Sequence, residues 1–408
     1  MTSDQNTVSD SLFNSEDPIF RNKDLLKIGH VPKADRIVGR DTEISKLATR
    51  LNGAVHGYSP DNVVIYGKTG TGKSLVSKHV SSRARNAAED GVEVGTAYID
   101  CAEDKTETQV ISSLSESLND ENQTGIEVPY TGLSTSKYYK LLWDIMDSQY
   151  NSTIIILDEI DMMQDDNVLM KLSRAEEAGK IDTSIGVVAI SNKIQYVENL
   201  NERVKSSFQH KELFFKPYDA NQLREIMYNR EDAFHDGVLT EDVIPLAAAL
   251  SAQEHGDARK AIDILRHAGE VAYEEESNKV LEEHVRQAKQ HAEKGRFREL
   301  IDGAPTQAKA SLLALTELDI NSNKDAFMTS EVYSQYEAIC KELDIDKLSV
   351  RRVRDILKEQ AFLDILEIER VNMGKKGGIH LQNRLIEDSE VVRETILEDT
   401  RMDRWIDG

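Results

Sequence analysis

Residues 67–74 read GKTGTGKS, which has the spacing G-x-x-x-x-G-K-[ST] of a phosphate-binding loop. The apolar stretch VVIY precedes the loop and the helical pattern LVSKHVSSRAR follows it. Lys73 would neutralise the β- and γ-phosphates, and the Ser74 hydroxyl can bind Mg²⁺. The alternative, a flexible strand–helix turn, is disfavoured by these matching flanks. We assign the nucleotide phosphates to Gly67, Lys68, Thr69, Gly70, Thr71, Gly72, Lys73, Ser74 and Leu75.

An apolar stretch that ends in acids, IIILDEID, follows at residues 154–161. Asp158 would support Mg²⁺ through its water shell together with Ser74, and Glu159 would orient and deprotonate the attacking water. We interpret Asp161 as an exposed acid at the start of a helix. Without the phosphate loop, an ordinary strand followed by an acidic helix cap would be the preferred interpretation.

Three further polar residues could reach the phosphates. Asn192 follows the apolar stretch IGVVAIS, where ligands of open α/β sheets bind, although it could also simply begin a turn. The segment NKIQ, residues 192–195, has Gln195 where a guanine-binding motif needs an acid, so we predict adenine as the base. Arg203 and Arg259 precede helical patterns, and from spacing alone each is as easily a surface ion pair.

The elements that must position these residues follow from the apolar pattern. Short β-branched stretches at residues 62–66, 95–100, 153–158 and 185–191 lack polar alternation, which is typical of a parallel sheet covered on both faces. We predict an α/β P-loop core, then a helical region from Pro217 to about Gly303, and then a third compact domain. The expected boundaries are a tail at 1–17, the core at 18–215, a helical lid at 216–303, the third domain at 304–385 and a C-terminal tail at 386–408.

The third domain has the pattern of a winged helix, with two helices followed by a strand, a GKKGG loop and a second strand. In LSVRRVRDILKEQAF we expect one buried stripe, formed by Val350, Val353, Leu357 and Ala361. The cations on the other side could enter a major groove, while the loop lysines would contact phosphates. A solvated face on a protein-binding winged helix is the alternative. The predicted DNA contacts here are Arg351, Arg352, Arg354, Lys358, Lys375 and Lys376.

Composition limits the remaining possibilities. The chain of 408 residues has 50 Lys and Arg against 73 Asp and Glu, a net charge of −23, so any nucleic-acid surface must be local. We suspect a salt-adapted surface. Cys101 and Cys340 are far apart and indicate neither zinc nor a disulfide framework. No apolar run approaches a membrane span, and we expect a cytoplasmic, nucleoid-associated protein without a membrane partner.

Together these segments resemble an AAA+ ATPase, and more narrowly the archaeal replication initiators of the origin-recognition and helicase-loader type. The specific matches are IFRNKDLLKIGHVPKADRIVGRDTEI, VPYTGLSTSKYYKLL, ERVKSSF, GDARKAIDILRHAGEVA and EVYSQYEAICKELDIDKLSVRRVRDIL. Two departures are Glu202 in place of the family's usual proline and AFLDILEIERV in place of a glycine turn. The second leaves the position of the wing strands open.

The resemblance implies roles for individual residues. Asn192 matches the first sensor, Arg259 the second sensor in the lid, and Arg203 the arginine of the RVKSS segment. It also implies that the insert around residues 128–142 touches DNA, for which we select Gly132 and Ser134. We further assign Tyr218 and Arg230 to the nucleotide site.

The implied function is an ATP-switched replication initiator. ATP or ADP with Mg²⁺ would be bound, hydrolysis would be slow, and the partners would be double-stranded origin DNA, the replicative helicase and other initiator copies. Two alternatives remain open from the sequence: an ATP-regulated transcription factor that loads nothing, and a DNA-remodelling AAA+ motor.

Overall fold

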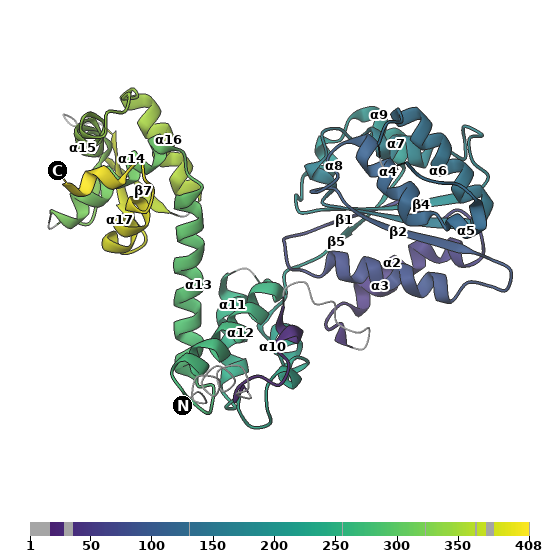
Figure 1. The fold of residues 1–408 in the computed structure, drawn as a ribbon, viewed down its shortest axis with the longest axis horizontal. Coiled ribbons are helices and arrows are strands. Elements are labelled where there is room, and N and C mark those ends of the chain that lie inside the picture. The colour runs from purple at the N-terminus through teal and green to yellow at the C-terminus, as the bar shows by residue number, and fades with distance from the viewer. Residues whose placement is uncertain are drawn as a thin grey trace, which may run out of the picture. The chain divides into compact units, whose positions relative to one another are not determined.

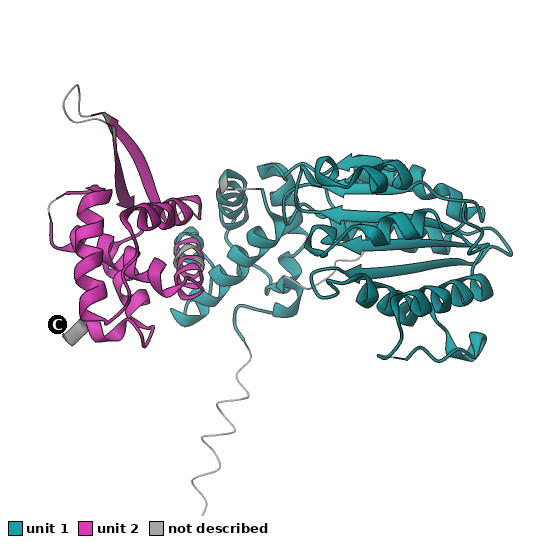
Figure 2. Cartoon of the chain, turned by 90° about the horizontal axis from the view of Figure 1, so that it is seen from above, with its two compact units in different colours: residues 1–288 teal, residues 289–408 magenta. Residues whose placement is uncertain are grey.

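The computed structural model describes residues 17–27, 36–129, 131–254, 256–322, 324–363, 365–372 and 379–407. The chain divides into two compact units, residues 1–288 and 289–408 (Figure 2). Unit 1 contains the α/β core and the helical lid, and unit 2 contains the winged helix. Helix α13, Glu282–Asp302, runs across the division.

The core of unit 1 is a parallel sheet of five strands in the order β2-β3-β4-β1-β5. Their bounds are β1 Val63–Tyr66, β2 Val94–Asp100, β3 Ser152–Asp158, β4 Ser184–Ser191 and β5 Lys211–Phe214. The predicted parallel sheet is confirmed. The sequence analysis did not find β5, because this edge strand, KELF, buries only Leu213 and therefore has no apolar run.

Helices cover both faces of the sheet (Figure 1). In β3, Ile154 and Ile156 face one cluster with α2 and α3, whereas Ile155 and Leu157 face the other cluster. Both faces are buried under helices, which explains why the strands lack polar alternation. The helices on the first face are α2 Asp41–Val55 and α3 Lys73–Asn86, and those on the second include α4 Glu107–Leu118, α6 Thr135–Gln149, α7 Asn167–Ser173 and α9 Glu202–Phe208. Three short pieces complete the core: α5 Glu121–Thr124, η3 Ile160–Met162 and α8 Tyr196–Asn199.

The lid is the helical part of unit 1 that follows the sheet. Its elements are α10 Ala220–Tyr228, η4 Glu231–Ala233, α11 Val243–Glu254 and α12 Ala258–Glu274. Asp219 forms a capping box with Gln222 at the start of α10. Asp257 caps α12 by accepting from the N–H groups of Arg259 and Lys260. These caps satisfy N–H groups that a helix cannot pair internally, so both helices start at defined positions.

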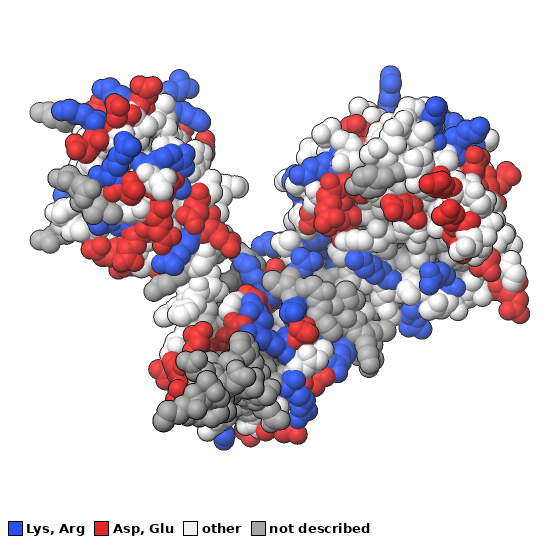
Figure 3. All heavy atoms as spheres, viewed as in Figure 1, with Lys and Arg blue, Asp and Glu red and all other residues white. Residues whose placement is uncertain are grey.

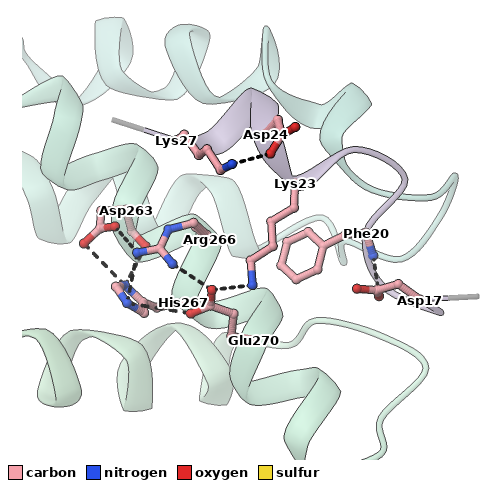
Figure 4. Close-up of polar contacts among 9 residues, drawn as sticks. All are labelled: Asp17, Phe20, Lys23, Asp24, Lys27, Asp263, Arg266, His267 and Glu270. Atoms are coloured by element: carbon pink, nitrogen blue, oxygen red, sulfur yellow. Dashed lines mark hydrogen bonds and ion pairs between the residues drawn. The ribbon is translucent and has the colours of Figure 1, made fainter. Parts of the chain in front are cut away.

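The segment at residues 17–27 completes the lid core, although it lies far from the lid in sequence. Ile19 and Leu26 are fully buried there, and Phe20 packs on Phe234 with 5.0 Å between ring centroids. Figure 4 shows Lys23, in the short helix η1 Lys23–Leu26, between the Phe20 ring and Glu270; its Nζ lies 2.6 Å from a Glu270 carboxylate oxygen. The start of the described chain therefore fastens onto α12.

We expect Phe20→Ala to lower the free energy of unfolding by about 3 kcal/mol, because it leaves a cavity between Phe234 and α12. Urea denaturation of the full chain would measure the change. Tyr58, whose side chain is 71% exposed, provides the matched aromatic control. Equal losses for Phe20→Ala and Tyr58→Ala would show that the packing of Phe20 adds nothing specific.

Unit 2 has the predicted winged-helix order. It contains α14 Thr306–Ile320, β6 Phe327–Met328, α15 Thr329–Glu342, α16 Val350–Phe362, β7 Leu366–Asn372 and β8 Ile379–Leu385. The strands form an antiparallel sheet in the order β6-β8-β7. Lys375 and Lys376 of the predicted wing loop lie outside the described residues.

The last segment, expected as a tail, instead packs on unit 2. It forms α17 Ser389–Leu397 and η5 Asp403–Asp407, and Val392, Ile396 and Met402 are fully buried in the winged-helix core. The buried Lys309 Nζ lies 2.7 Å from Asp399, which also pairs with Arg401. The i, i+4 spacing of Val392 and Ile396 is the sequence signal for this helix that went unused. Among the described residues, no helix is long and apolar enough to span a membrane.

Candidate nucleotide site and DNA-facing surfaces

A pocket of about 350 Å³ lies in unit 1 between the carboxyl edge of the sheet and the lid. Most of the residues assigned to the nucleotide from sequence line it. These are Thr69, Gly70, Thr71, Gly72, Lys73, Ser74, Leu75, Asp158, Glu159, Asn192, Tyr218, Arg230 and Arg259. Gly67 and Lys68 lie behind the lining and contact it through their carbonyls, whereas Arg203 is elsewhere.

The phosphate loop joins β1 to α3. Gly72 has φ 84°, a left-handed conformation that a Cβ would strain, and α3 begins at the next residue. The free N–H groups of the first turn of α3 therefore face the pocket, which is the arrangement that binds phosphate. Thr71 Oγ1 donates to the Lys68 carbonyl at 2.8 Å and holds the loop in shape.

Lys73 is the central cation of this loop. Its side chain is buried, and its Nζ donates to the carbonyls of Gly67 and Lys68 at 2.9 and 2.8 Å and to Asn192 Oδ1 at 2.9 Å. Burial lowers the pKa of Lys73 to about 8, opposed by the nearby Asp158 carboxylate. All three N–H groups of this ammonium donate to uncharged acceptors, so an anion can replace them without breaking an ion pair among the described residues.

Asp158 is held at the end of β3 by two donors. Tyr98 Oη donates to its Oδ2 at 2.8 Å, and the Glu159 N–H donates to its Oδ1 at 3.0 Å. Burial and Asp158 together raise the pKa of Tyr98, so the phenol stays protonated and remains a donor. Asp158 and Ser74 both line the pocket, and their carboxylate and hydroxyl are the hard oxygen donors that Mg²⁺ prefers, so the residues present fit this ion.

Asn192 links the cation to the acid. Its Oδ1 accepts from Lys73, and its Nδ2 lies 3.4 Å from Glu159 Oε1. The prediction that Asp161 is exposed is wrong: its side chain is only 7% exposed, accepts from Ser191 Oγ at 2.8 Å and pairs with Lys193. Asp161 therefore holds the loop that carries Asn192.

Glu159 has φ 51°, a left-handed backbone rarely adopted by a residue with a Cβ, and it lines the pocket. We expect Glu159→Gln to keep ATP binding within about twofold while lowering hydrolysis on the order of 100-fold, because the amide cannot accept the proton of water. Steady-state phosphate release and equilibrium ATP binding would be measured on the same samples. Undiminished hydrolysis would remove Glu159 from the mechanism.

The lid contacts the phosphate loop directly. The Ala258 N–H donates to the Gly70 carbonyl at 3.1 Å, and a Cβ on Gly70 would lie 1.7 Å from Asp257 Oδ1. A glycine is therefore needed at position 70 for two reasons. A Cβ there would clash with the lid, and the backbone φ of 68° is left-handed. Arg259, the residue after Ala258, is exposed and lines the pocket. Its side chain has no hydrogen bond or ion pair with any described residue. Its guanidinium is available to a phosphate.

The pocket lining also contains apolar side chains, those of Ile37, Val38, Ile226 and Ile262, together with Tyr218. Such a surface suits the flat face of a base. The sequence analysis did not select Ile37 and Val38, since a short apolar pair ahead of a helix has no motif spacing.

Arg40 is another residue that the sequence analysis missed. It is buried, donates to the carbonyls of Thr71 and Lys216, and stacks on Tyr218 with 3.9 Å from its guanidinium carbon to the ring centroid. It ties the phosphate loop to the strand–lid connection. The only sequence signal is its position in VGRDTEI, immediately before a helix with acids in its first turn.

Arg203 does not meet the pocket of its own chain. It lies exposed in the first turn of α9, where its N–H is capped by Asn201. The helix buries Val204 and Phe208 against the sheet and directs the neighbouring positions to solvent. A role in catalysis within a single chain is therefore not supported by its position.

Helix α16 of unit 2 exposes Arg351, Arg352, Arg354 and Lys358. The predicted apolar stripe is partly confirmed: Val353 and Leu357 are fully buried and Ala361 is half-buried, but Val350 is 47% exposed. Ile356 and Gln360 are buried as well, because the rest of unit 2 covers a face of α16 that is wider than one residue in each turn. On the visible face of the molecule, basic side chains occur in small groups among acids (Figure 3).

The four exposed cations differ in their partners. Arg352 lies 3.7 Å from Glu359, whereas Arg351, Arg354 and Lys358 have no ion pair with any described residue. Those three cations can therefore bind an anion without breaking an ion pair to a described residue.

In the AAA+ insert, Gly132 and Ser134 are exposed just before α6. Tyr138 Oη donates to the Pro129 carbonyl and fixes that loop.

Three regions of the chain match known protein families. Residues 56–191 match an AAA domain, residues 224–290 a Cdc6 AAA+ ATPase-type lid domain, and residues 299–395 a CDC6 C-terminal winged helix domain. With the phosphate loop, the lid and the winged helix in this order, the fold and site define a nucleotide-binding AAA+ protein of the Cdc6 type.

Whole-chain similarity narrows this class. The chain is 79% identical over 403 residues to ORC1-type DNA replication protein 4 of Halobacterium salinarum, covering 99% of this chain and 98% of that protein. It is 40% identical over 364 residues to an ORC1-type DNA replication protein of Pyrococcus furiosus, covering 88% and 85%. The chain belongs to the family of ORC1-type DNA replication proteins. The structure of the Aeropyrum pernix ORC1 protein in complex with DNA matches with a TM-score of 0.76 and 35% identity, covering 96% of this chain and all of that one.

Proposed function

We propose that this protein is an ATP-dependent replication initiator, which binds origin DNA through α16, the wing and the AAA+ insert. The observation that carries the proposal is a nucleotide pocket beneath a lid, combined with a winged helix whose Arg351, Arg354 and Lys358 have no ion pair with any described residue. The Aeropyrum relative, whose structure is a complex with DNA, supports the assignment of DNA as the partner. Recruitment or loading of the replicative helicase rests on family membership alone.

ATP with Mg²⁺ works as a switch in this proposal. Ser74 and Asp158 would hold the ion, which neutralises phosphate charge when bound, and Lys73 and Arg259 would contact phosphates from the core and the lid. Because Arg259 and the residue that bonds to Gly70 both belong to the start of α12, nucleotide binding would fix the lid on the core. Slow hydrolysis at Glu159 and Asn192 would release it.

Arg203 would act on the nucleotide of a neighbouring initiator copy. Its exposure and its absence from the pocket of its own chain support this assignment. The proposed partners are therefore double-stranded DNA, the helicase and other initiator copies, in a cytoplasmic, nucleoid-associated protein.

Genome-wide crosslinking of this protein in its own cells, compared with a map of replication starts, tests the proposal. Sharp enrichment at one or more starts is the expected result. Enrichment at promoters away from every start would favour an ATP-regulated transcription factor. Fast DNA-stimulated ATP turnover in a defined ring would favour a remodelling motor.

A further inference from the structure

Lys78 is a half-buried lysine of α3 that lines the nucleotide pocket. It is four residues after Ser74, and helical side chains point back toward the N-terminus of their helix, so its ammonium extends toward the start of α3. Its Nζ lies 3.3 Å from the centroid of the Tyr98 ring. Within the described chain, this ammonium forms no hydrogen bond and no ion pair within 4 Å. Its charge is therefore held in place by an aromatic face and not by an acid.

The ring that holds Lys78 also holds an acid, because Tyr98 Oη donates to Asp158 Oδ2 at 2.8 Å. Asp100 and Asp158 are register partners at the ends of β2 and β3, so their side chains project to the same face of the sheet. Tyr98 shares this face, which α3 covers. Both carboxylates line the pocket. Burial lowers the pKa of Lys78, and the Asp158 and Asp100 carboxylates oppose this, so both acids act on its charge.

One fixed cation therefore lies beside both candidate metal ligands. Lys78 is separated from Asp158 by the Tyr98 ring, and it is the i+4 neighbour of Ser74 on α3. A fixed cation at such a place has two opposite electrostatic effects. It attracts phosphates and balances the acids, and it repels a divalent cation.

We infer that Lys78 sets the affinity of the nucleotide site for its divalent metal, and keeps that affinity low through the fixed charge that it places beside Asp158. This inference rests on the proposed nucleotide function and goes further by naming the residue that tunes metal binding. Because Lys78 supplies part of the positive charge that Mg²⁺ would otherwise provide, a nucleotide can bind before the metal does. Loose metal binding also suits a nucleotide that works as a switch with slow turnover, since phosphoryl transfer depends on the metal.

The test uses Lys78→Met in the full chain, with Lys46→Met as the matched control. Lys46 lies exposed on α2 and does not line the pocket, so its substitution removes the same charge elsewhere. Mn²⁺ replaces Mg²⁺ as the probe, and electron paramagnetic resonance measures free Mn²⁺ in samples saturated with ADP. Lys78→Met should bind Mn²⁺ roughly 10-fold more tightly than wild type, whereas Lys46→Met should stay within about twofold.

A second measurement separates a charge effect from a structural one. With EDTA present, Lys78→Met should bind ADP about threefold or more weakly than wild type, because a cation near the phosphates is lost. A merely structural role would weaken metal and nucleotide binding together, whereas the inferred role changes the two affinities in opposite directions. Lys78→Arg keeps the charge and the ring contact, and it should keep both affinities within about twofold of wild type. If Lys78→Met does not fold, Lys78→Gln removes the same charge and takes its place.

Three results would overturn the inference. The first is an unchanged Mn²⁺ affinity in Lys78→Met, and the second is a fall in its affinities for both Mn²⁺ and ADP. The third is a Lys78→Arg variant that binds Mn²⁺ as tightly as Lys78→Met, because the charge would then not be the cause. Failure of the proposed nucleotide function looks different, since wild-type protein would then bind neither ADP nor ATP and Lys73→Ala would change nothing.

Discussion

Lys73→Ala should weaken ATP binding on the order of 1,000-fold. Lys73 Nζ is the buried cation at the centre of the phosphate loop, and it already makes three hydrogen bonds that orient it. Each charge-assisted bond to a phosphate oxygen is worth roughly 1.5–3 kcal/mol, and the alanine variant loses at least two such bonds. Equilibrium titration with a fluorescent nucleotide would measure the loss.

The same lysine predicts a pH dependence of binding. Burial lowers its pKa to about 8, so the free side chain is charged at pH 7 and loses its proton as the pH rises through 8. Phosphates are ionised above about pH 7 and bind the charged amine, so binding must take up a proton at higher pH. ATP affinity of the wild-type protein should therefore fall, by up to about tenfold per pH unit, above pH 8.

Two controls make this result specific. Lys46 is an exposed lysine on α2, and Lys46→Ala should keep wild-type affinity and the wild-type pH profile. Lys73→Ala should show a flat profile between pH 7.5 and 9.5. A fall of the same size in the alanine variant would assign the titration to another group.

The second large effect is expected on DNA. Arg351→Glu/Arg354→Glu should weaken duplex binding on the order of 1,000-fold, because two exposed cations of α16, neither ion-paired to a described residue, become repulsive carboxylates. Fluorescence anisotropy with a duplex recovered at a replication start, and with a random duplex, would measure the change in affinity. The salt slope of binding should also become shallower by about one unit for each phosphate that the protein no longer neutralises.

Lys324→Glu/Lys341→Glu gives the matched control, since both lysines are exposed in unit 2 outside α16 and the change in net charge is the same. This control should stay within about threefold of wild-type affinity, a general effect of charge. Equal losses in the two double variants would mean that net charge, and not the α16 surface, governs binding. If only the site-specific duplex is affected, these arginines contact bases and not phosphates.

The predictable parts of this protein are its binding motifs, because each motif consists of residues that are neighbours in the sequence. The phosphate loop, the acids after β3 and Asn192 after β4 each follow a buried strand, and a parallel sheet brings the ends of its strands to one edge. The pattern of apolar runs without alternation was equally decisive, because it follows from helices on both faces. The edge strand β5 was missed because only Leu213 of it is buried, whereas the helix α17 was missed although Val392 and Ile396 have a helical spacing.

Only the tertiary structure decided which distant residues meet. The phosphate loop is held by Arg40, and the Asp158 carboxylate by Tyr98. The start of α12 is held by Asp257, and no spacing rule connects these residues with the groups they hold. Burial likewise separated residues that look alike in sequence: Asp161 is fixed inside while Glu159 faces the pocket. The sequence by itself determined the class of chemistry, because backbone loops and strand ends are local. The partners of each charge depend on packing between segments that are distant in the chain, and that packing places Arg230 in the lining of the pocket.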